Sequence, residues 1–287
     1  MGDPAGRPPL SDTVPPPPGE GGPIPPGLDA TLVLVRHGES TFIAEGRFQG
    51  QAETPLTAVG RRQATLAATR LARPHVAPAL PVPAGAPTEL VHSPLGRTTE
   101  TATAIAAALA EVGVDVTPRP EPGFLEVNQG EWEGLHRDEI EARYGRTLSA
   151  WRRTPLEAWA PGGETLPEIQ ARVRPALAAV LDRLADGRAP GTLDRSQVAG
   201  YRDPLPEHPW SIVVGHDGVF KVTLLTLFDL PLDRFWMWSM DLCGITIVEL
   251  RAGRPVMRSH NLTAHLAAMA DAEAVAESEE RASGGAL

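Results

Sequence analysis

The sequence predicts an α/β fold, in which helices pack on a mixed sheet, and three observations support this prediction. Continuous apolar runs occupy 31–35, 89–93 and 211–216, and such runs are typical of strands covered on both faces. Segments with helical periodicity separate these runs. Two further short strands near the C-terminus have the pattern of a hairpin. Strands that alternate with helices are the mark of the α/β class.

The expected strands lead into polar residues. T-L-V-L-V at 31–35 ends at Arg36-His37-Gly38, E-L-V-H-S fills 89–93, and S-I-V-V-G-H fills 211–216. The last two strands, 245–250 and 256–260, flank R-A-G-R at 251–254, which predicts a tight turn. The sheet should therefore carry an antiparallel member.

Helices are expected between the strands, each marked by a start signal or an apolar stripe. Their ranges are 57–73 with Thr57 as the N-cap, 97–111, 166–186 after a Pro-Gly-Gly turn, and 219–228. Two stretches do not fit the alternation. Residues 124–163 hold three tryptophans and many charges and are interpreted as an inserted helical cap, whereas 187–209 are interpreted as a long surface loop.

The composition divides the chain into one domain with two tails. Residues 1–28 contain ten prolines and six glycines, so we expect a disordered tail there. The domain, with its cap inserted at about 124–163, should span 29–268, and 269–287 should form a helical or disordered C-terminal tail. We assign the proline-rich segment no function.

Charge and cysteine content exclude several classes of protein. The net charge of −10 disfavours nucleic acid as a partner. The N-terminal segment lacks the pattern of a secretory signal and no later run is apolar enough for a membrane span, so we expect no membrane partner. The single cysteine, Cys243, cannot form an intrachain disulfide, and we expect a cytoplasmic location.

The unusual polar residues gather where strands end. Arg36 and His37 follow the first strand, Ser93 and Arg97 the second, and His216 the strand at 211–216. If these strands are neighbours, two histidines and two arginines converge on one crevice at the carboxyl edge of the sheet. Two guanidiniums can hold a tetrahedral dianion, and a neutral imidazole beside them is a nucleophile toward phosphorus. The pattern therefore favours phosphoryl transfer.

Each of these residues also has a simpler interpretation. His37 could be an ordinary loop histidine, and Arg97, which opens a helix, could be surface charge. His216 and Asp217 could be a metal-binding pair, but such sites need further ligands at helical spacing. We therefore expect no metal and no cofactor.

Five motifs, taken together and in order, resemble the histidine phosphatase superfamily with its phosphoglycerate mutase-like fold, in its first branch. They are L-V-R-H-G-E-S at 34–40, R-F-Q-G-Q-A-E-T-P-L-T-A-V-G-R-R-Q-A at 47–64, H-S-P-L-G-R-T-T-E-T-A at 92–102, F-L-E-V-N-Q-G-E-W-E-G at 124–134 and V-G-H-D-G-V at 214–219. The resemblance covers about residues 31–265. It implies a three-layer α/β/α sandwich around a six-stranded mixed sheet with one antiparallel strand.

The resemblance also implies a role for each site residue. His37 becomes the phosphate-accepting nucleophile, and Arg36, Arg97 and His216 complete the phosphate pocket. Glu126 matches the general acid, with Glu131 and Glu133 as the alternatives. Gln49 and Gly50 match a loop that closes on the phosphate and binds it.

Two positions depart from the family pattern. Ile43 stands where many members have an asparagine that donates to the phosphate, so one hydrogen bond is missing or comes from a neighbour. Asp217 stands where a small or uncharged residue is common, and its carboxylate would repel a phosphate unless it points away. We expect Asp217 to orient a backbone group or an arginine.

The sequence thus favours hydrolysis of a small phosphorylated metabolite, a sugar phosphate or phosphoglycerate-like ester, through a phosphohistidine. One alternative is a cofactor-dependent phosphoglycerate mutase, but the stretch after Glu126 has the shorter phosphatase form. A second alternative is a non-catalytic phosphate or phosphoprotein binding module, which only Ile43 supports. The cap arginines could contact a second acidic group or form a solvated helix face; they are Arg137, Arg143, Arg146, Arg152 and Arg153. The small phosphate ester is the expected partner, and a homodimer is left open.

Overall fold

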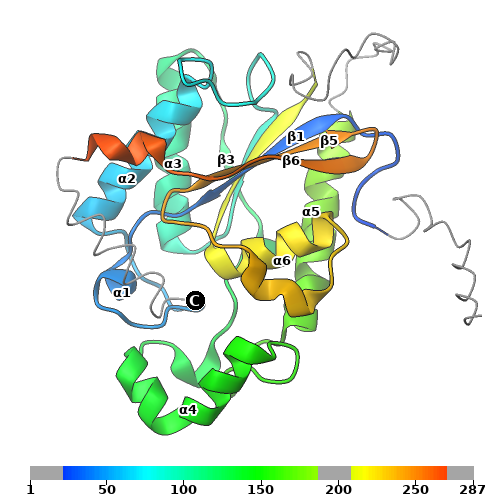
Figure 1. Ribbon diagram of the computed structural model, residues 1–287. Coiled ribbons are helices and arrows are strands. Elements are labelled where there is room, and N and C mark those ends of the chain that lie inside the picture. Colours follow the sequence, from blue (N-terminus) through cyan, green and yellow to red (C-terminus); the bar gives the residue numbers. More distant parts are fainter. Residues whose placement is uncertain (1–21, 187–207, 270–287) are drawn as a thin grey trace, which may run out of the picture.

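A six-stranded mixed sheet forms the centre of the computed structural model, which describes residues 22–186 and 208–269 (Figure 1). In chain order its strands are β1 (Ala30–Arg36), β2 (Glu89–His92), β3 (Pro118–Pro120), β4 (Trp210–Gly215), β5 (Ile245–Arg251) and β6 (Arg254–Leu262). Their spatial order is β3-β2-β4-β1-β5-β6. β5 runs antiparallel to both of its neighbours, while the β1, β2, β3 and β4 pairs are parallel. The predicted mixed sheet with one antiparallel strand is confirmed.

Helices cover both faces of this sheet (Figure 1). On one face lie α2 (Ala58–Ala72) and α3 (Gly96–Glu111), and on the other lie α5 (Leu166–Asp186) and α6 (Asp217–Leu227). Two more helices, α1 (Thr41–Ala44) and α4 (Arg137–Arg153), stand outside the layers, α4 in the cap. The three-layer α/β/α architecture agrees with the prediction.

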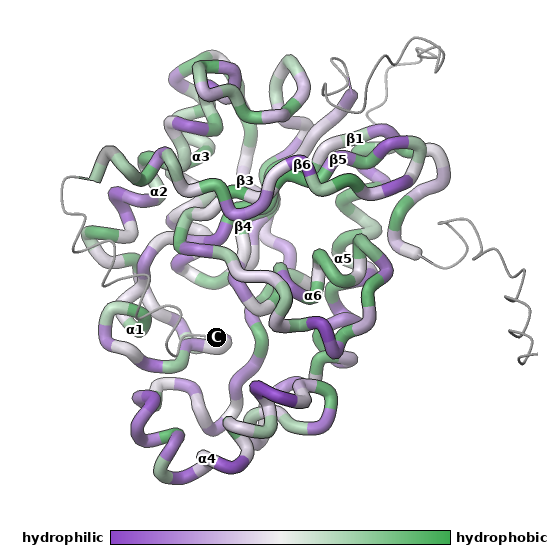
Figure 2. The backbone as a smooth tube through the Cα atoms, viewed as in Figure 1, coloured by the Kyte–Doolittle hydropathy of each residue, from purple (hydrophilic) through white to green (hydrophobic). Residues whose placement is uncertain are grey.

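The continuous apolar strands are explained by a core on each side of the sheet. Along β1, Leu32 and Leu34 point to the core under α5 and α6, while Val33 and Val35 point to the core under α2 and α3. Side chains alternate between the faces of a strand, so only a run apolar at every position can fill both cores. Figure 2 shows the contrast between the mostly hydrophobic α6 and the mostly polar α4.

Most predicted helix limits agree with the structure. Thr57 caps α2, accepting a hydrogen bond from the Gly60 N–H at 3.0 Å, as its position indicated. α6 begins at Asp217, two residues before the predicted start. β3 was not predicted, because its sequence Pro-Arg-Pro lacks both an apolar run and most of its backbone donors.

The predicted N-terminal tail extends too far along the chain. Ile24 and Leu28 are buried in the larger core, so residues 22–28 are packed against the domain rather than part of a tail. The remainder of that tail, most of the predicted 187–209 loop and nearly all of the C-terminal tail lie outside the described residues. Within the described ranges, no helix is both long enough and apolar enough to cross a membrane.

The predicted cap is present and joins the main body through aromatic side chains. α4 is its main helix, with non-helical backbone at Tyr144. Trp132 and Trp151 are buried and meet edge to face, whereas Trp159 is 39% exposed. Trp151 in turn packs against Trp236, which follows α6 in the chain, with ring centroids 4.7 Å apart. The cap is therefore anchored to the sheet domain near the carboxyl ends of the strands.

Candidate active site

The histidine after β1 is held in one tautomer. His37 is buried, and its Nδ1 lies 2.7 Å from the carbonyl oxygen of Gly38. A carbonyl oxygen only accepts, so Nδ1 carries the proton and the neutral ring has its free electron pair on Nε2. Burial, reinforced by the nearby Arg97 and Arg36 guanidiniums, holds the pKa of His37 well below its ordinary value of 6.5. The ring is thus neutral with Nε2 unprotonated, which is the state that a nucleophile toward phosphorus needs.

The second histidine lies beside the first because β1 and β4 are neighbours. Arg36 at the end of β1 pairs with Gly215 at the end of β4, so His37 and His216 leave the sheet together. His216 Nε2 lies 2.8 Å from Ser93 Oγ at the end of β2. Burial, followed by the charge of Arg97, lowers the pKa of His216 well below 6.5. The three strand ends named by the sequence do converge.

The two arginines both donate hydrogen bonds to main-chain carbonyl groups. Arg36 donates from Nη1 to the Met240 carbonyl, and Arg97 donates from Nη1 and Nη2 to the carbonyls of Ala52 and Gly50 at 2.9 and 2.8 Å. Burial lowers the pKa of Arg97 to about 10, so the group remains a cation at neutral pH. Within the described residues, the buried Nε atoms of both arginines have no hydrogen-bond partner, and nor does His216 Nδ1. Three nitrogens of the expected phosphate pocket are therefore left unpaired.

A buried carboxyl group reaches the same region from the segment after β3. Glu126 accepts backbone N–H bonds from Val127 and Val219, both at 2.9 Å, and from Gly218 at 3.2 Å. Burial raises the pKa of Glu126, the N–H of Val127 opposes the rise, and the Asp217 carboxylate adds to it. A Cβ on Gly218 would lie 2.7 Å from the Glu126 carboxylate, so glycine permits this approach at the start of α6.

The other glutamates of the cap motif have structural partners. Glu133 accepts the N–H groups of Gln51 and Gln129 at 2.8 and 3.0 Å, and Glu131 accepts the hydroxyl of Tyr144 at 2.7 Å. Of the three glutamates, Glu126 alone is buried beside the start of α6. The geometry therefore favours Glu126 over Glu131 and Glu133 as the acid.

The loop that contains Gln49 and Gly50 is fixed next to Arg97. Ser40 and Thr54 both donate hydroxyl hydrogen bonds to Gln49 Oε1. This arrangement leaves the amide Nε2 as the end of the side chain that can donate to a phosphate oxygen. Gly50 has a φ of +51°, and a Cβ there would lie 2.1 Å from a Glu133 carboxylate oxygen, so the position requires glycine.

The two departures from the family pattern have structural explanations. Ile43 is fully buried and forms an apolar cluster with Leu242. Asp217 turns away to accept the Met240 N–H at 3.0 Å and the ammonium of Lys221 at 2.7 Å. The prediction that Asp217 orients a backbone group is confirmed, but its charged partner is a lysine rather than an arginine.

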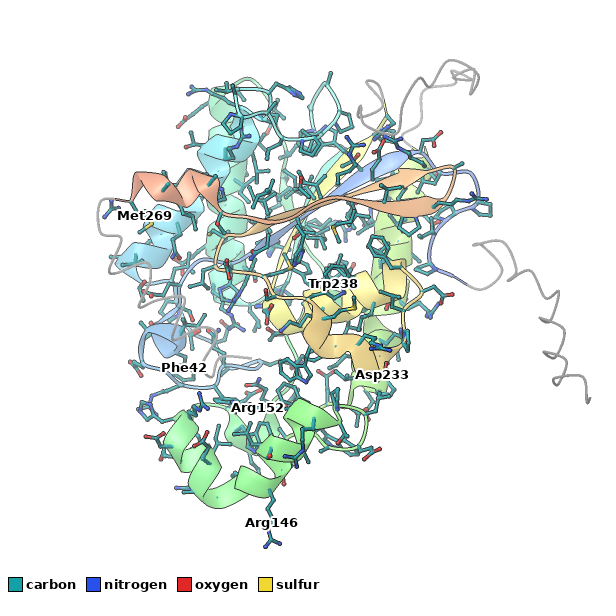
Figure 3. All side chains as sticks on the ribbon, in the orientation of Figure 1. Phe42, Arg146, Arg152, Asp233, Trp238 and Met269 are labelled. Atoms are coloured by element: carbon teal, nitrogen blue, oxygen red, sulfur yellow. The ribbon has the colours of Figure 1, made fainter. Side chains whose placement is uncertain are left out.

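The cap arginines mainly contact other side chains on the surface of α4 or extend away from the protein. Arg137 forms an i,i+4 ion pair with Glu141 at 2.8 Å, and Arg153 donates to Ser149. Arg146 extends from α4 away from the rest of the protein (Figure 3). These contacts agree with a solvated helix face. No group of three or more His, Cys, Asp or Glu side chains suited to a metal ion occurs within residues 22–186 and 208–269.

Sequence reasoning missed several residues that hold the site in place. The Met240 carbonyl accepts a hydrogen bond from Arg36, and the Met240 N–H donates one to Asp217. Gln51 and Arg172 bind the main chain of Glu126. Backbone groups have no signature in the sequence, and an arginine inside a helix resembles surface charge. The Q-G-Q motif that contains Gln51 was the one available signal.

A sheet edge with two neutral histidines, two buried arginines and a buried carboxyl group defines an α/β enzyme of phosphoryl-group chemistry. Residues 32–190 and 197–263 match the model of the histidine phosphatase superfamily, branch 1. The chain belongs to this superfamily.

Similar proteins include both phosphatases and mutases. Phosphoserine phosphatase 1 of Hydrogenobacter thermophilus is 26% identical over 82% of this chain and 93% of its own length. Glucosyl-3-phosphoglycerate phosphatase of Mycolicibacterium vanbaalenii is 30% identical over 71% and 76%. The probable phosphoglycerate mutase GpmB of an Enterobacter species is 37% identical over 55% and 66%. The solved structure of Bacillus stearothermophilus YhfR is 25% identical, with a TM-score of 0.63 over 83% of this chain and 99% of that chain.

Proposed function

We propose that this protein hydrolyses phosphomonoesters of small metabolites, sugar phosphates or phosphoglycerate-like esters, through a phosphohistidine at His37. The observation that supports it most is the fixed tautomer of His37, whose Nε2 is unprotonated and buried beside Arg36 and Arg97. Two relatives are named as phosphatases of phosphoserine and of glucosyl-3-phosphoglycerate. Both names refer to esters of small metabolites, which supports the substrate class.

In the first step, the electron pair of His37 Nε2 forms a bond to phosphorus as the bond from phosphorus to the ester oxygen breaks. The leaving oxygen takes the proton of the Glu126 carboxyl group. Arg36, Arg97, His216 and Gln49 stabilise the charge on the transferring phosphoryl oxygens, because they are placed before the reaction begins. The Gly38 carbonyl holds Nδ1–H throughout, which compensates for the positive charge that develops on the ring.

In the second step, the Glu126 carboxylate takes a proton from water, and the water oxygen attacks phosphorus. The bond from phosphorus to Nε2 breaks and its electron pair returns to the ring. Inorganic phosphate is the product, and both His37 and Glu126 regain their starting protonation states. A residue that is acid in one step and base in the next needs a pKa near the working pH, and burial moves that of Glu126 in this direction.

The test is to incubate the protein with labelled phosphomonoesters and follow the label. We expect acid-labile, alkali-stable phosphate on the wild type, none on His37→Ala, and release of inorganic phosphate. Labelling of His37→Ala would overturn the assignment of His37 as the nucleophile. Return of the label to a second phosphoglycerate without phosphate release would instead establish a mutase. A panel of sugar phosphates, phosphoglycerates and glycosylated phosphoglycerates then ranks substrates by kcat/KM.

A further inference from the structure

Arg172 of α5 makes an unusual concentration of contacts with the segment that carries Glu126. Its Nη1 donates to the carbonyls of Gly123 and Leu125 at 3.0 and 2.7 Å, and its Nη2 donates to the Glu126 carbonyl at 2.9 Å. Its Nε and Nη2 also hold the carboxylate of Glu164 at 2.7 and 2.8 Å. All five N–H groups of the guanidinium are used, three of them on one short stretch of main chain.

The surrounding contacts tie the same stretch to the loop beside Arg97. Gln51 Nε2 donates to the Glu126 carbonyl at 2.9 Å and lies 3.4 Å from Glu164 Oε2. The N–H of Asn128 donates to that same carboxylate oxygen at 2.9 Å. The Arg172–Glu164 ion pair therefore forms hydrogen bonds with the main chain both before and after Glu126.

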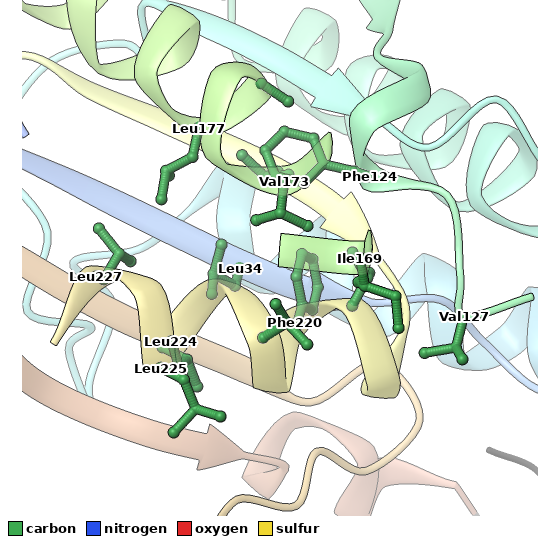
Figure 4. Close-up of a cluster of buried hydrophobic side chains, with 14 of the residues drawn as sticks. Leu34, Phe124, Val127, Ile169, Val173, Leu177, Phe220, Leu224, Leu225 and Leu227 are labelled. Atoms are coloured by element: carbon green, nitrogen blue, oxygen red, sulfur yellow. The ribbon is translucent and has the colours of Figure 1, made fainter. Parts of the chain in front are cut away.

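This stretch needs such support because it has no regular structure of its own. Residues 125–129 are neither helix nor strand. Phe124 and Val127 anchor the two sides in the core between α5 and α6 (Figure 4), but an apolar contact does not fix the rotation of a peptide group. Charge-assisted hydrogen bonds from a planar guanidinium do fix it, because their directions are set.

We propose that Arg172 is a positioning residue for the general acid: it holds the Glu126 main chain so that the carboxyl group meets the leaving oxygen. The proposal rests on the proposed function, in which Glu126 donates a proton in the first step. Arg172 touches Glu126 only through its backbone carbonyl, so its loss should impair proton donation and leave the nucleophilic attack of His37 largely intact.

The test compares two leaving groups in Arg172→Lys, which keeps the charge but loses the planar fork. Misplacing a reacting group by about 1 Å costs on the order of 100-fold, so we expect kcat/KM for an alkyl phosphate to fall by about 10 to 100-fold. Toward p-nitrophenyl phosphate, whose phenolate leaves without a proton, the loss should stay below about 3-fold. The matched control is Arg183→Lys, which alters the ion pair of another α5 arginine, that of Arg183 with Glu89.

A double variant separates positioning from general damage. In the Glu126→Gln background, Arg172→Lys should cause no further loss toward the alkyl phosphate, because the proton that it positions is already gone. Equal losses on both substrates, or a full additional loss in that background, would overturn the proposal. If Glu126→Gln itself shows no dependence on the leaving group, the proposed role of Glu126 fails first, and the two failures are thereby distinguished.

Two further variants carry the test if Arg172→Lys does not fold. Glu164→Gln removes the charge of the carboxylate that forms the ion pair with Arg172. Gly123→Ala must push the segment from α5, because the new Cβ would lie 2.3 Å from the Ala176 Cβ and 2.8 Å from the Arg172 carbonyl oxygen. Both should show the same dependence on the leaving group, and a uniform loss in both would overturn the proposal.

Discussion

The imidazole rings of His37 and His216 meet edge to face, with their centroids 5.0 Å apart and an angle of 64° between their planes. Two protonated rings at this separation would repel each other inside a buried pocket that already holds two guanidiniums. The pocket therefore requires both rings to be neutral, and this requirement affects the pH dependence of stability.

Stability should fall as the pH drops below 6.5. Burial depresses the pKa of both histidines in the folded state, so below 6.5 the unfolded chain binds protons that the folded chain refuses. Each histidine should remove up to about 1.4 kcal/mol of unfolding free energy per pH unit, until the pH reaches its folded pKa. Urea titrations between pH 7.5 and 5.5 measure this slope.

His216→Gln should make the fall in unfolding free energy with pH less steep, because one of the two histidines no longer contributes to it. A slope in His216→Gln equal to that of the wild type would show that the ring accepts a proton in the folded protein.

Glu126→Gln should be impaired according to the leaving group. The amide cannot donate the proton that an alkoxide needs, so kcat/KM for a sugar phosphate should fall by about 100 to 10,000-fold, and much less for p-nitrophenyl phosphate. Steady-state rates on both substrates provide the measurement. Glu131→Gln and Glu133→Gln are the matched controls in the same motif. A larger loss in either control than in Glu126→Gln would move the acid to that residue.

Activity should survive EDTA. Arg36 and Arg97 supply, at the end of β1 and the start of α3, the positive charge that a metal ion would bring to the phosphoryl oxygens. Rates measured before and after dialysis against the chelator should agree within error. Loss of activity that a divalent ion restores would instead support a metal role for His216 and Asp217.

The buried ion pair between Asp217 and Lys221 should show strong coupling. Their side chains are 10% and 5% exposed, and the ammonium also lies 4.9 Å from the ring centre of Trp236. Removing one partner leaves a buried charge uncompensated, so Asp217→Asn and Lys221→Met should each lower the unfolding free energy by about 3–5 kcal/mol. The double variant should lose clearly less than the sum.

Urea unfolding of the four proteins gives the coupling energy for the buried pair. The exposed pair of Arg137 and Glu141 provides the comparison, with an expected coupling of only about 0.3–0.5 kcal/mol. Additive losses for Asp217 and Lys221 would contradict the coupling.

The proposed catalytic residues could be predicted from the sequence more completely than the residues that position them. His37 and His216 follow apolar runs typical of buried strands, and they converge because β1 and β4 are neighbours in the sheet. The resemblance selected Glu126 from three glutamates in its motif, and its burial supports that choice. Arg172 lies 46 positions from Glu126, and no local pattern links a helix arginine to a carbonyl at that distance. The sequence predicted a backbone partner for Asp217 but not which one, because the N–H of Met240 is 23 positions away.

The pairing of β1 with β4 also determines when catalytic competence arises during folding. His216 and Ser93, which meet at 2.8 Å, are 123 positions apart, and the strand that carries His37 pairs with the strand that carries His216. Contacts between such distant segments form slowly, because the loop-closure entropy must be lost before the contacts form. The helices can form from local contacts alone, so helical signal should return early in refolding. Enzymatic turnover should return only with the last strand pairing.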